Sequence, residues 1–396
     1  ALELAAQGVA VTLIERDPQP FSRASLRNEG KIHLGLIYAN ERSLATARLQ
    51  LEGALQFSAL LRRWLGAAAG ELRRSTPFHY LVARDSLLDA DQLEAYYAAV
   101  QRLYDAQRER APQLDYLGTR PRHLYTRIDP ARLAPHLRIE HFAAAFETAE
   151  FALDTAQLAR LVRRALAAHP LIELRLGHRV EAVCADDGGG FVVNGESTQG
   201  RWTLESQQVV SCLWEDRLRI DSALGLVPPP GWVHRLKYRV IARLPRAMRQ
   251  GPSVTLVIGP YGDVVVRDDG TAYFSWYPVG CKGWSHDLAP PHAWDAPCRA
   301  DLSAADAQGV AREILGAIDA WYPGAAQCEP ILVDAGVIVG YGHTDVNDPA
   351  SGLHGRTRVG VRSQGGYHSL DPGKLTTAPL FGKQAADRVL QALRMP

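Results

Sequence analysis

A single titratable ring stands in an apolar stretch near the start of the chain. The segment RNEGKIHLGLIYAN, residues 27–40, places His33 between Gly30 and Gly35. Imidazole is the side chain best suited to taking up a proton near neutral pH, so His33 is a candidate general base. Glycines on either side would clear the backbone for a flat ligand. The pattern also leaves open a histidine that is simply hydrogen-bonded inside the core.

A second polar, glycine-rich segment lies at the other end of the chain. The segment SQGGYHSLDPGKLTT, residues 363–377, follows a short strand predicted at 358–361 and precedes a predicted helix. Free N–H groups at a helix start favour negative charge, and Lys374 adds a cation there. An N-capped helix after an ordinary loop is the alternative, with Thr376 or Thr377 as the cap.

The first residues predict the elements that would position a nucleotide. Residues 1–7 have helical character, Gly8 ends the helix, and the strand VAVTLIE ends on Glu15. This order matches the second half of a dinucleotide-binding βαβ unit, in which the acid binds ribose hydroxyls. The strand and Gly-x-Gly-x-x-Gly loop of the first half would lie upstream of Ala1. We expect the sequence given to lack them.

Composition excludes several classes of protein. The 396 residues are enough for two domains, and 44 Lys plus Arg balance 43 Asp plus Glu, which argues against a nucleic-acid partner. No C-x-x-C pair occurs among the five cysteines, so we expect no metal site and a reducing, cytoplasmic location. No apolar run reaches the about 18 residues that predict a membrane span, although peripheral membrane contact stays open. Lysine is scarce and occurs at Lys31, Lys237, Lys282, Lys374 and Lys383.

Four segments together resemble the FAD-dependent oxidoreductases of the D-amino-acid oxidase superfamily. VTLIERD resembles the second strand with its ribose-binding acid, and ASLRNEGKIHLGLIYAN resembles the loop Ser-x-x-Asn-x-Gly-x-Ile-His-x-Gly-x-x-Tyr. The segment 153–183 is similar to the helix and strand that bring a valine to the adenine. GYHSLDPGKLTT is similar to the closing flavin loop, especially in the glycerol-3-phosphate and L-2-hydroxyglutarate dehydrogenase branches.

One segment departs from that family pattern. QQVVSCLWEDRLRID keeps the family's apolar strand and Trp214, but Cys212 and Leu213 stand where the family has Ala-Gly. The departure leaves the subfamily, and therefore the substrate, undetermined.

The resemblance implies an α/β fold with two domains. One is a Rossmann-like FAD-binding domain with a truncated first strand, made of residues 1–76, 148–231 and 330–396. The other is an α+β substrate domain on an antiparallel sheet, made of residues 77–147 and 232–329. Strand-like runs separated by GPYG and DDG turns agree with such a sheet; they are residues 236–244, 253–259, 263–269 and 271–278.

The resemblance also implies roles for individual residues. His33 and Arg362 would be catalytic, His33 as a base or noncovalent flavin contact and Arg362 as a clamp on a substrate carboxylate or phosphate. Covalent flavin attachment at His33 is an alternative. The expected cofactor-binding residues are Glu15, Ser25, Asn28, Lys31, Ile32, His33, Val180, Trp214, Gly366, Gly373, Lys374, Leu375 and Thr376. The expected substrate-pocket residues are Tyr38, Tyr273, Trp276, Arg362 and Tyr367, with ordinary sheet packing as the alternative for the aromatic ones.

These features predict an FAD-dependent oxidase or dehydrogenase. It would take a hydride from a small hydroxy- or amino-acid or related alcohol and pass electrons to oxygen or a quinone. A nicotinamide-dependent dehydrogenase built on the same βαβ unit is one alternative, which the GKLTT loop argues against. A truncated, non-catalytic remnant of a flavoprotein is the other.

Overall fold

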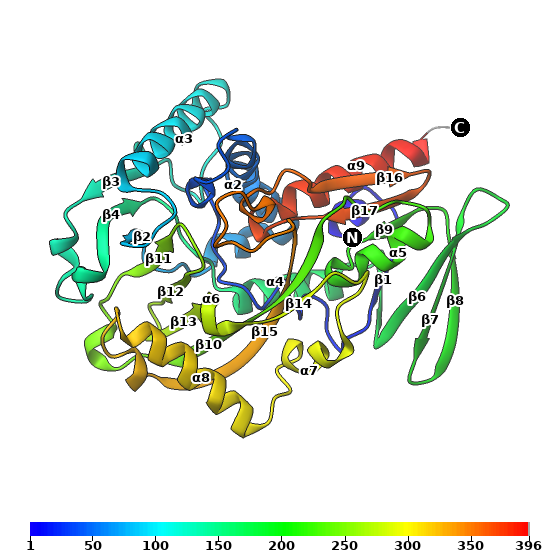
Figure 1. Ribbon diagram of the computed structural model, residues 1–396. Coiled ribbons are helices and arrows are strands. Elements are labelled where there is room, and N and C mark those ends of the chain that lie inside the picture. Colours follow the sequence, from blue (N-terminus) through cyan, green and yellow to red (C-terminus); the bar gives the residue numbers. More distant parts are fainter. Residues whose placement is uncertain (395–396) are drawn as a thin grey trace.

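The computed structural model describes residues 1–394, whose strands form four separate sheets with helices around them (Figure 1). The α/β fold class is the one that the sequence predicts. The α-helices are α1 (Leu2–Ala6), α2 (Ala45–Leu65), α3 (Ala90–Arg110), α4 (Thr155–Ala168), α5 (Arg217–Ala223), α6 (Tyr277–Gly280), α7 (Asp295–Cys298), α8 (Ala304–Asp319) and α9 (Ala378–Arg394).

The largest sheet has nine strands, and we call it the large sheet. Its strands run in the order β14-β10-β13-β12-β11-β2-β4-β3, with β15 also paired to β10, and only the pair β11–β2 is parallel. They are β2 (Phe78–Ala83), β3 (Tyr125–Ile128), β4 (Phe142–Thr148), β10 (Trp232–Arg243), β11 (Ser253–Val257), β12 (Gly262–Val266), β13 (Thr271–Trp276), β14 (Cys281–Ser285) and β15 (Glu329–Tyr341).

Strand β15 bears on the predicted domain division. It pairs with β10 along its whole length, from Tyr341 opposite Trp232 to Glu329 opposite Arg243. The expected boundary at residue 330 would assign this strand to the FAD-binding domain, away from its partner. We therefore propose the boundary after Tyr341 and keep the other divisions as predicted.

The two faces of the large sheet pack against different elements. The inner face carries Tyr80, Val265 and Tyr273, which share one core with residues of segment 32–36 and of α2. The outer face carries residues such as Phe274, which pack with α8. Side chains alternate between the faces of a strand, so the parity of a residue in these strands decides which core it enters.

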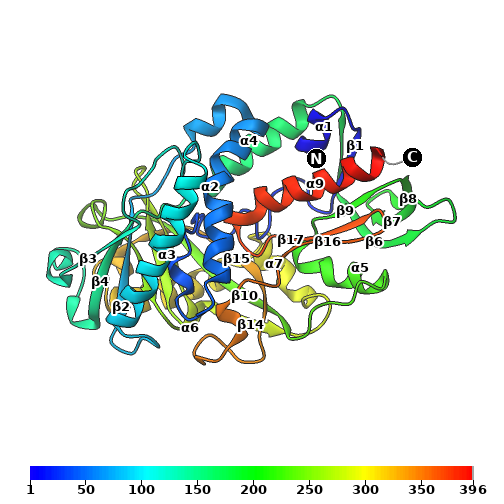
Figure 2. The same ribbon diagram turned by 90° about the horizontal axis from the view of Figure 1, so that it is seen from above.

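The remaining strands form three small sheets. Strand β1 (Val11–Glu15) pairs in parallel with β5 (Ile172–Leu176), and β6 (His178–Ala185), β7 (Phe191–Ser197) and β8 (Gly200–Ser206) form a meander. Strands β9 (Val209–Ser211), β16 (Gly360–Gln364) and β17 (Tyr367–Asp371) form what we call the terminal sheet. Helices α2 and α9 lie side by side near it (Figure 2). The strand expected upstream of Ala1 lies outside the described residues.

Ion pairs bring three strand ends to one edge. Arg16, just after β1, lies 2.6 Å from Glu215, which closely follows β9. Arg217, also after β9, lies 2.7 Å from Asp371 at the end of β17. The carboxyl ends of β1, β9 and β17 therefore meet at one edge, which is where ligands bind in α/β proteins.

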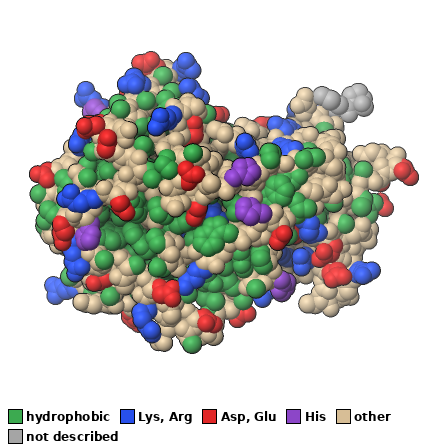
Figure 3. Space-filling view, viewed as in Figure 1, with side chains coloured by type: hydrophobic (Ala, Val, Ile, Leu, Met, Phe, Trp, Pro, Cys, Tyr) green, Lys and Arg blue, Asp and Glu red, His purple; other side chains and the backbone are tan. Residues whose placement is uncertain are grey.

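Charged side chains of both signs are interspersed over the surface shown in Figure 3. This distribution agrees with a net charge of only +1. Within residues 1–394, no helix combines the length and the apolar character needed to cross a membrane.

A buried ionic network fixes the end of β17. The guanidinium of Arg217, whose side chain is 1% exposed, donates to Asp371 at 2.7 Å, to Asp221 at 3.2 Å and to the hydroxyl of Tyr341 at 3.0 Å. The other carboxylate oxygen of Asp371 accepts the N–H of Gly373 at 3.0 Å. The network thus connects α5, β15 and the segment that follows β17.

Replacing Arg217→Met should destabilise the protein strongly. The change leaves two buried carboxylates without their cation, and breaking such a pair costs about 3–5 kcal/mol. Urea unfolding followed by circular dichroism measures the loss. The control is Arg201→Met, because Arg201 is 91% exposed and its nearest acid, Glu196, lies 3.6 Å away. Equal unfolding midpoints for both variants would contradict this role for the network.

Candidate active site

The two segments singled out in the sequence meet in the structure. The backbone N–H of His33 donates to Oγ1 of Thr376 at 2.9 Å. The ammonium of Lys374 lies 3.8 Å from a carboxylate oxygen of Glu29. Leu375 packs against the core that contains Ile32. Residues from opposite ends of the chain therefore lie in contact here.

Buried charges hold the segment before His33 against the large sheet. Arg239 on β10 donates to both carboxylate oxygens of Asp334 on β15, at 2.6 and 3.1 Å. The same guanidinium donates to the carbonyl oxygens of Leu26 at 3.0 Å and Asn28 at 3.2 Å. Arg27 lies 3.2 Å from Asp334. These bonds fix the direction in which the chain enters the site.

Lys31 provides a second anchor, which differs from its expected contact with FAD. Its ammonium donates to the hydroxyl of Thr255 and lies 3.0 Å from Asp263, both on the inner face of the large sheet. It also stacks over the ring of Phe78 at 4.0 Å from the centroid. A buried ammonium needs such partners, and that of Lys31 has them within the protein itself.

The glycines beside His33 do not clear space for a ligand. A side-chain carbon on Gly30 would lie 2.1 Å from the carbonyl oxygen of Leu153, and one on Gly35 would lie 3.0 Å from Cα of Ala47. Both glycines also have positive φ, +79° and +102°. They therefore permit close packing of the protein's own backbone, and the expectation of clearance for a flat ring was wrong.

The ring of His33 is buried between two carboxylates. Nε2 lies 3.5 Å from Glu29 and Nδ1 lies 3.8 Å from Glu150, and the side chain is 3% exposed. Neither nitrogen has a hydrogen-bond partner among residues 1–394. Burial lowers the pKa of His33, and the neighbouring Glu29 opposes that effect. His33 is therefore not a hydrogen-bonded core histidine, and its ring is neutral at neutral pH.

Glu150 ties the segment to the inner face of the large sheet. One carboxylate oxygen accepts the backbone N–H of Leu34 at 2.6 Å, and the other accepts the hydroxyl of Tyr80 at 2.5 Å. Burial and the charge of Glu150 raise the pKa of Tyr80 well above its ordinary value. Two donors thus hold the carboxyl group of Glu150 in place, 3.8 Å from Nδ1 of His33.

Basic and acidic groups alternate around His33. Burial opposes ionisation of Glu29, but the positive charge of Lys374 outweighs it and holds the pKa of Glu29 well below its ordinary value. Burial would lower the pKa of Lys237, but Tyr273 and nearby carboxylates raise it. Burial raises the pKa of Tyr273 to about 12 and lowers that of Lys374. At neutral pH Lys237 is therefore a cation and Tyr273 a neutral hydroxyl.

The residues at the edge where strands β1, β9 and β17 end fit a flavin nucleotide. Glu15 ends β1, and burial raises the pKa of its carboxyl group, which accepts the N–H of Asp17 at 2.9 Å. Ser211 ends β9, and its buried hydroxyl has no partner among residues 1–394. Gly373, with φ of +64°, turns the chain toward Lys374 and Thr376. Together with the unpartnered His33 ring, these groups offer donors and acceptors to a flat polar ligand.

Two other expected cofactor contacts organise the segment itself. The side-chain amide of Asn28 donates to the carbonyl oxygens of Ala24 at 2.9 Å and Ser25 at 3.0 Å, while its oxygen accepts the N–H of Gly30 at 2.8 Å. The side chain of Ser25 is exposed. Asn28 therefore shapes the turn, and the role of Ser25 toward FAD stays a prediction.

Three predicted residues lie away from His33. Trp276 is on the outer face of the large sheet, where its ring stacks 5.8 Å from Trp321, opposite to the face of Tyr273. Gly366 directly precedes β17 and Tyr367 begins it, beside Val209 at the start of β9, whereas the site is at the strands' carboxyl ends. The Tyr367 hydroxyl is buried against Asp221 at 2.8 Å. The structure therefore places none of these three residues beside His33, although Trp276 and Tyr367 were expected in the substrate pocket and Gly366 at the cofactor.

Three more predicted residues show no contact with the segment around His33. Arg362 lies in β16 opposite Ser369, and its buried Nη1 has no hydrogen-bond partner among residues 1–394. The carbonyl oxygen of Val180 accepts a hydrogen bond from Arg219 at 3.0 Å. The indole of Trp214 donates to the carbonyl oxygen of Val337 at 2.8 Å. None of these contacts involves the segment around His33.

Several charged residues of the site were missed in the sequence. Glu29 stands four residues before His33 in the same motif, and the scarcity of lysine made Lys237 visible in principle. Glu150, Asp263 and Arg356 carry no local signal, because strands and loops far apart in the chain bring Glu150 to His33, Asp263 to Lys31 and Arg356 to Thr46 of α2.

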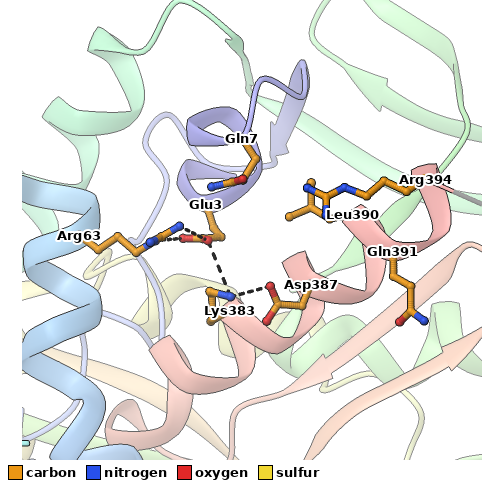
Figure 4. A pocket seen from close by; sticks show the side chains of 8 residues that line it. All are labelled: Glu3, Gln7, Arg63, Lys383, Asp387, Leu390, Gln391 and Arg394. Atoms are coloured by element: carbon orange, nitrogen blue, oxygen red, sulfur yellow. Dashed lines mark hydrogen bonds and ion pairs between the residues drawn. The ribbon is translucent and has the colours of Figure 1, made fainter.

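A surface pocket of about 500 Å³ lies elsewhere, between α1, α2 and α9 (Figure 4). Glu3 is held there by Arg63 at 2.7 and 2.8 Å, and Lys383 lies 3.9 Å from it. The residues that line it include none of the site's, so this pocket has no part in the proposed chemistry.

Fold and site together define a class of protein. A nucleotide-binding edge of parallel strands adjoins a large sheet, and a buried histidine lies where two loops join them, an arrangement typical of flavin-dependent oxidoreductases. The chain belongs to the DAO family of FAD-dependent oxidoreductases, whose family model matches residues 1–388. Its cofactor is therefore FAD, and it is an FAD-dependent oxidoreductase.

Solved structures agree with the fold. Glycine oxidase from Geobacillus kaustophilus has a TM-score of 0.67 at 17% identity, covering 98% of this chain and 90% of that one. Iminodiacetate oxidase from Chelativorans sp. BNC1 has a TM-score of 0.65 at 19% identity, with coverage of 100% and 93%. L-α-glycerophosphate oxidase from Mycoplasma pneumoniae has a TM-score of 0.63 at 15% identity, with coverage of 98% and 91%. No match was found among curated protein sequences.

Replacing Thr376→Val should loosen the junction of the two segments. The change keeps the side chain's shape but leaves the buried N–H of His33 unpaired, which costs about 1–3 kcal/mol. Thermal unfolding of the purified protein measures the change. The matched control, Thr203→Val, alters an exposed threonine on β8 and should have little effect. If the two variants unfold alike, the Thr376 bond does not hold the junction.

Proposed function

We propose that the enzyme oxidises a small hydroxy- or amino-acid or related alcohol, with His33 as the base. The observation that carries this proposal is a buried, neutral imidazole with both ring nitrogens unpartnered, at the junction of the two flavin-loop segments. A substrate OH or NH group must lose its proton as the adjacent C–H bond gives up a hydride. An imidazole with a free nitrogen can accept that proton.

Bound FAD supplies the hydride acceptor. We infer that Glu15 binds the ribose and that Gly373, Lys374 and Thr376 lie along the pyrimidine edge of the ring, where the reduced flavin gathers negative charge. The ammonium of Lys374 would stabilise that charge.

The two carboxylates beside His33 support its role as a base. Glu29 and Glu150 lie 3.5 and 3.8 Å from the ring nitrogens, and both would stabilise the imidazolium that forms when His33 takes the proton. Glu150 is fixed by its two donors, so it also orients the ring. We propose a noncovalent contact between His33 and the flavin.

The family match over residues 1–388 favours flavin chemistry over the nicotinamide and remnant alternatives. We propose oxygen or a quinone as the electron acceptor and keep the cytoplasm as the expected location.

Replacing His33→Ala should slow flavin reduction by about 10²–10⁴-fold, the usual contribution of a general base. The protein is loaded with FAD and mixed anaerobically with candidate hydroxy- and amino-acids, and flavin bleaching is followed by stopped flow. FAD content should be retained. The control is His123→Ala, which changes an exposed histidine. An unchanged reduction rate in His33→Ala would remove His33 from catalysis.

The reduction rate should also depend on pH in a characteristic direction. Burial lowers the pKa of His33 below its ordinary value of 6.5. The ring accepts a proton only when neutral, so the rate should stay level as pH falls from 8 to 6.5 and decline only below that. Anaerobic stopped-flow reduction across this range tests the prediction. A decline with a midpoint above pH 6.5 would show that another group, or a charged His33, controls the step.

A further inference from the structure

One segment of the large-sheet part of the chain reaches the edge where the nucleotide would bind. We call it the strap: it is the connection 286–303 between β14 and α8, and it contains the short helix α7. Figure 1 shows α7 beside the dark-blue chain that follows β1. Long connections with little regular structure are uncommon in compact proteins and are usually functional. The strap is therefore a candidate for a role that folding alone does not require.

An ion pair fastens the strap at that edge. Nη1 of Arg23 lies 2.6 Å from Oδ1 of Asp295, the first residue of α7. The other carboxylate oxygen of Asp295 has the exposed His292 at 3.7 Å, beyond hydrogen-bond distance. Burial opposes ionisation of Asp295, but its bond to Arg23 outweighs burial and keeps the pKa of Asp295 below its ordinary value. The carboxylate is therefore charged near neutral pH, with Arg23 as its main partner.

Arg23 also connects the strap to the end of β1. Its Nε and Nη2 donate to the two carboxylate oxygens of Asp17 at 2.8 and 3.1 Å. The N–H of Asp17 in turn donates to the carboxylate of Glu15, which we infer binds the ribose of FAD. A ribose held by Glu15 is therefore linked to the strap through Asp17 and Arg23.

The strap also shares an apolar cluster with the turn after β9. Cys298 is 2% exposed and lies in a cluster with residues of β10 and β15, and Trp294 packs against that cluster. Trp214, in the turn after β9, packs on the same cluster and has a left-handed φ of +51°. A bulky residue adopts such a φ only where the surrounding structure holds it there. The strap thus meets the nucleotide-binding edge at two of its strand ends.

The Arg23–Asp295 pair is more accessible than a neighbouring anchor of the same junction. The side chain of Asp295 is 21% exposed, compared with 1% for Asp334, the partner of Arg239. Water can take the place of a partner in an accessible pair, whereas a buried pair cannot open without leaving a charge unsolvated. Arg23 would still have its two bonds to Asp17 after Asp295 leaves. This pair can therefore open while the buried anchors stay closed.

We propose that the strap retains bound FAD and that the Arg23–Asp295 pair is its latch. With the pair closed, the strap covers the way by which the ribose end leaves Glu15. With the pair open, the cofactor exchanges with solvent, so opening of the latch sets the rate of FAD release. This inference rests on the proposed placement of the ribose at Glu15 and on no step of the oxidation.

FAD release in the absence of substrate tests the latch. The loaded protein is diluted, and the rise in fluorescence of the dissociated flavin gives the release rate. Asp295→Asn should speed release about tenfold, the effect of weakening a charge-assisted hydrogen bond between partly exposed groups. The matched control is Asp301→Asn, which removes the same charge from an exposed residue of the strap and should release FAD at the native rate.

Salt provides a second test, which the native protein alone can begin. Counterions screen a partly exposed ion pair, so native release should become faster as KCl is raised to about 0.5 M. Release from Asp295→Asn should respond less, because its latch carries no charge on the strap. A native release rate in Asp295→Asn, or a salt response in Asp295→Asn equal to that of the native protein, would overturn the proposal.

Trypsin reports on the strap without reference to flavin fluorescence. Arg299 is an exposed cleavage site within the strap. Cleavage after Arg299, followed by mass spectrometry of the loaded protein, should be severalfold faster in Asp295→Asn than in Asp301→Asn. Faster cleavage together with native FAD release would show a strap that opens without retaining the cofactor, and the proposal would then be wrong.

The outcomes also separate this proposal from the proposed function. If Asp295→Asn releases FAD faster but no hydroxy- or amino-acid bleaches the flavin, the latch stands and the proposed oxidation fails. If Asp295→Asn releases FAD at the native rate while such substrates bleach the flavin, the latch fails and the oxidation stands. Glu15→Gln tests the shared premise: release no faster than native would show that the ribose does not bind there, and the latch proposal would fall with it.

Discussion

The guanidinium of Arg239 lies buried between Asp334 and the carbonyl oxygens of Leu26 and Asn28. An isolated charge at this depth would be very costly, so its four acceptors must stay in place. Because two of them belong to the segment before His33, the ion pair fixes that segment to the large sheet. Lys31, five residues after Leu26, forms a second buried ion pair with the large sheet through Asp263. The position of His33 follows from these two anchors.

The other half of the site depends on a separate network in the terminal sheet. Arg217 and Asp371 fix the end of β17, and Asp371 also orients the N–H of Gly373. The bond from His33 to Thr376 is where the two anchored segments meet. The site thus lies between the large sheet and the terminal sheet, which the Arg217 network also joins through Tyr341 at the end of β15.

Buried polar groups without partners gather around this junction. The ring of His33, the hydroxyl of Tyr38 and the Nε atoms of Arg235 and Arg356 all lack hydrogen-bond partners among residues 1–394. Folding alone does not favour such groups, since each costs desolvation free energy without a compensating bond. A bound cofactor and substrate would supply partners for such groups, which gives these costs a functional reason.

The sequence by itself determined the two loops, the acid at the end of β1 and the histidine, because these features are local motifs. It also predicted four strands of the large sheet, β10 to β13, because strand-like runs bounded by turn residues are a local property. Only the tertiary structure decided which face of that sheet meets the loops. Tyr273 and Trp276 have opposite parity, so one of them had to face away from the site. Glu150 and Arg356 reach His33 and Tyr38 through long-range packing, which no local pattern records.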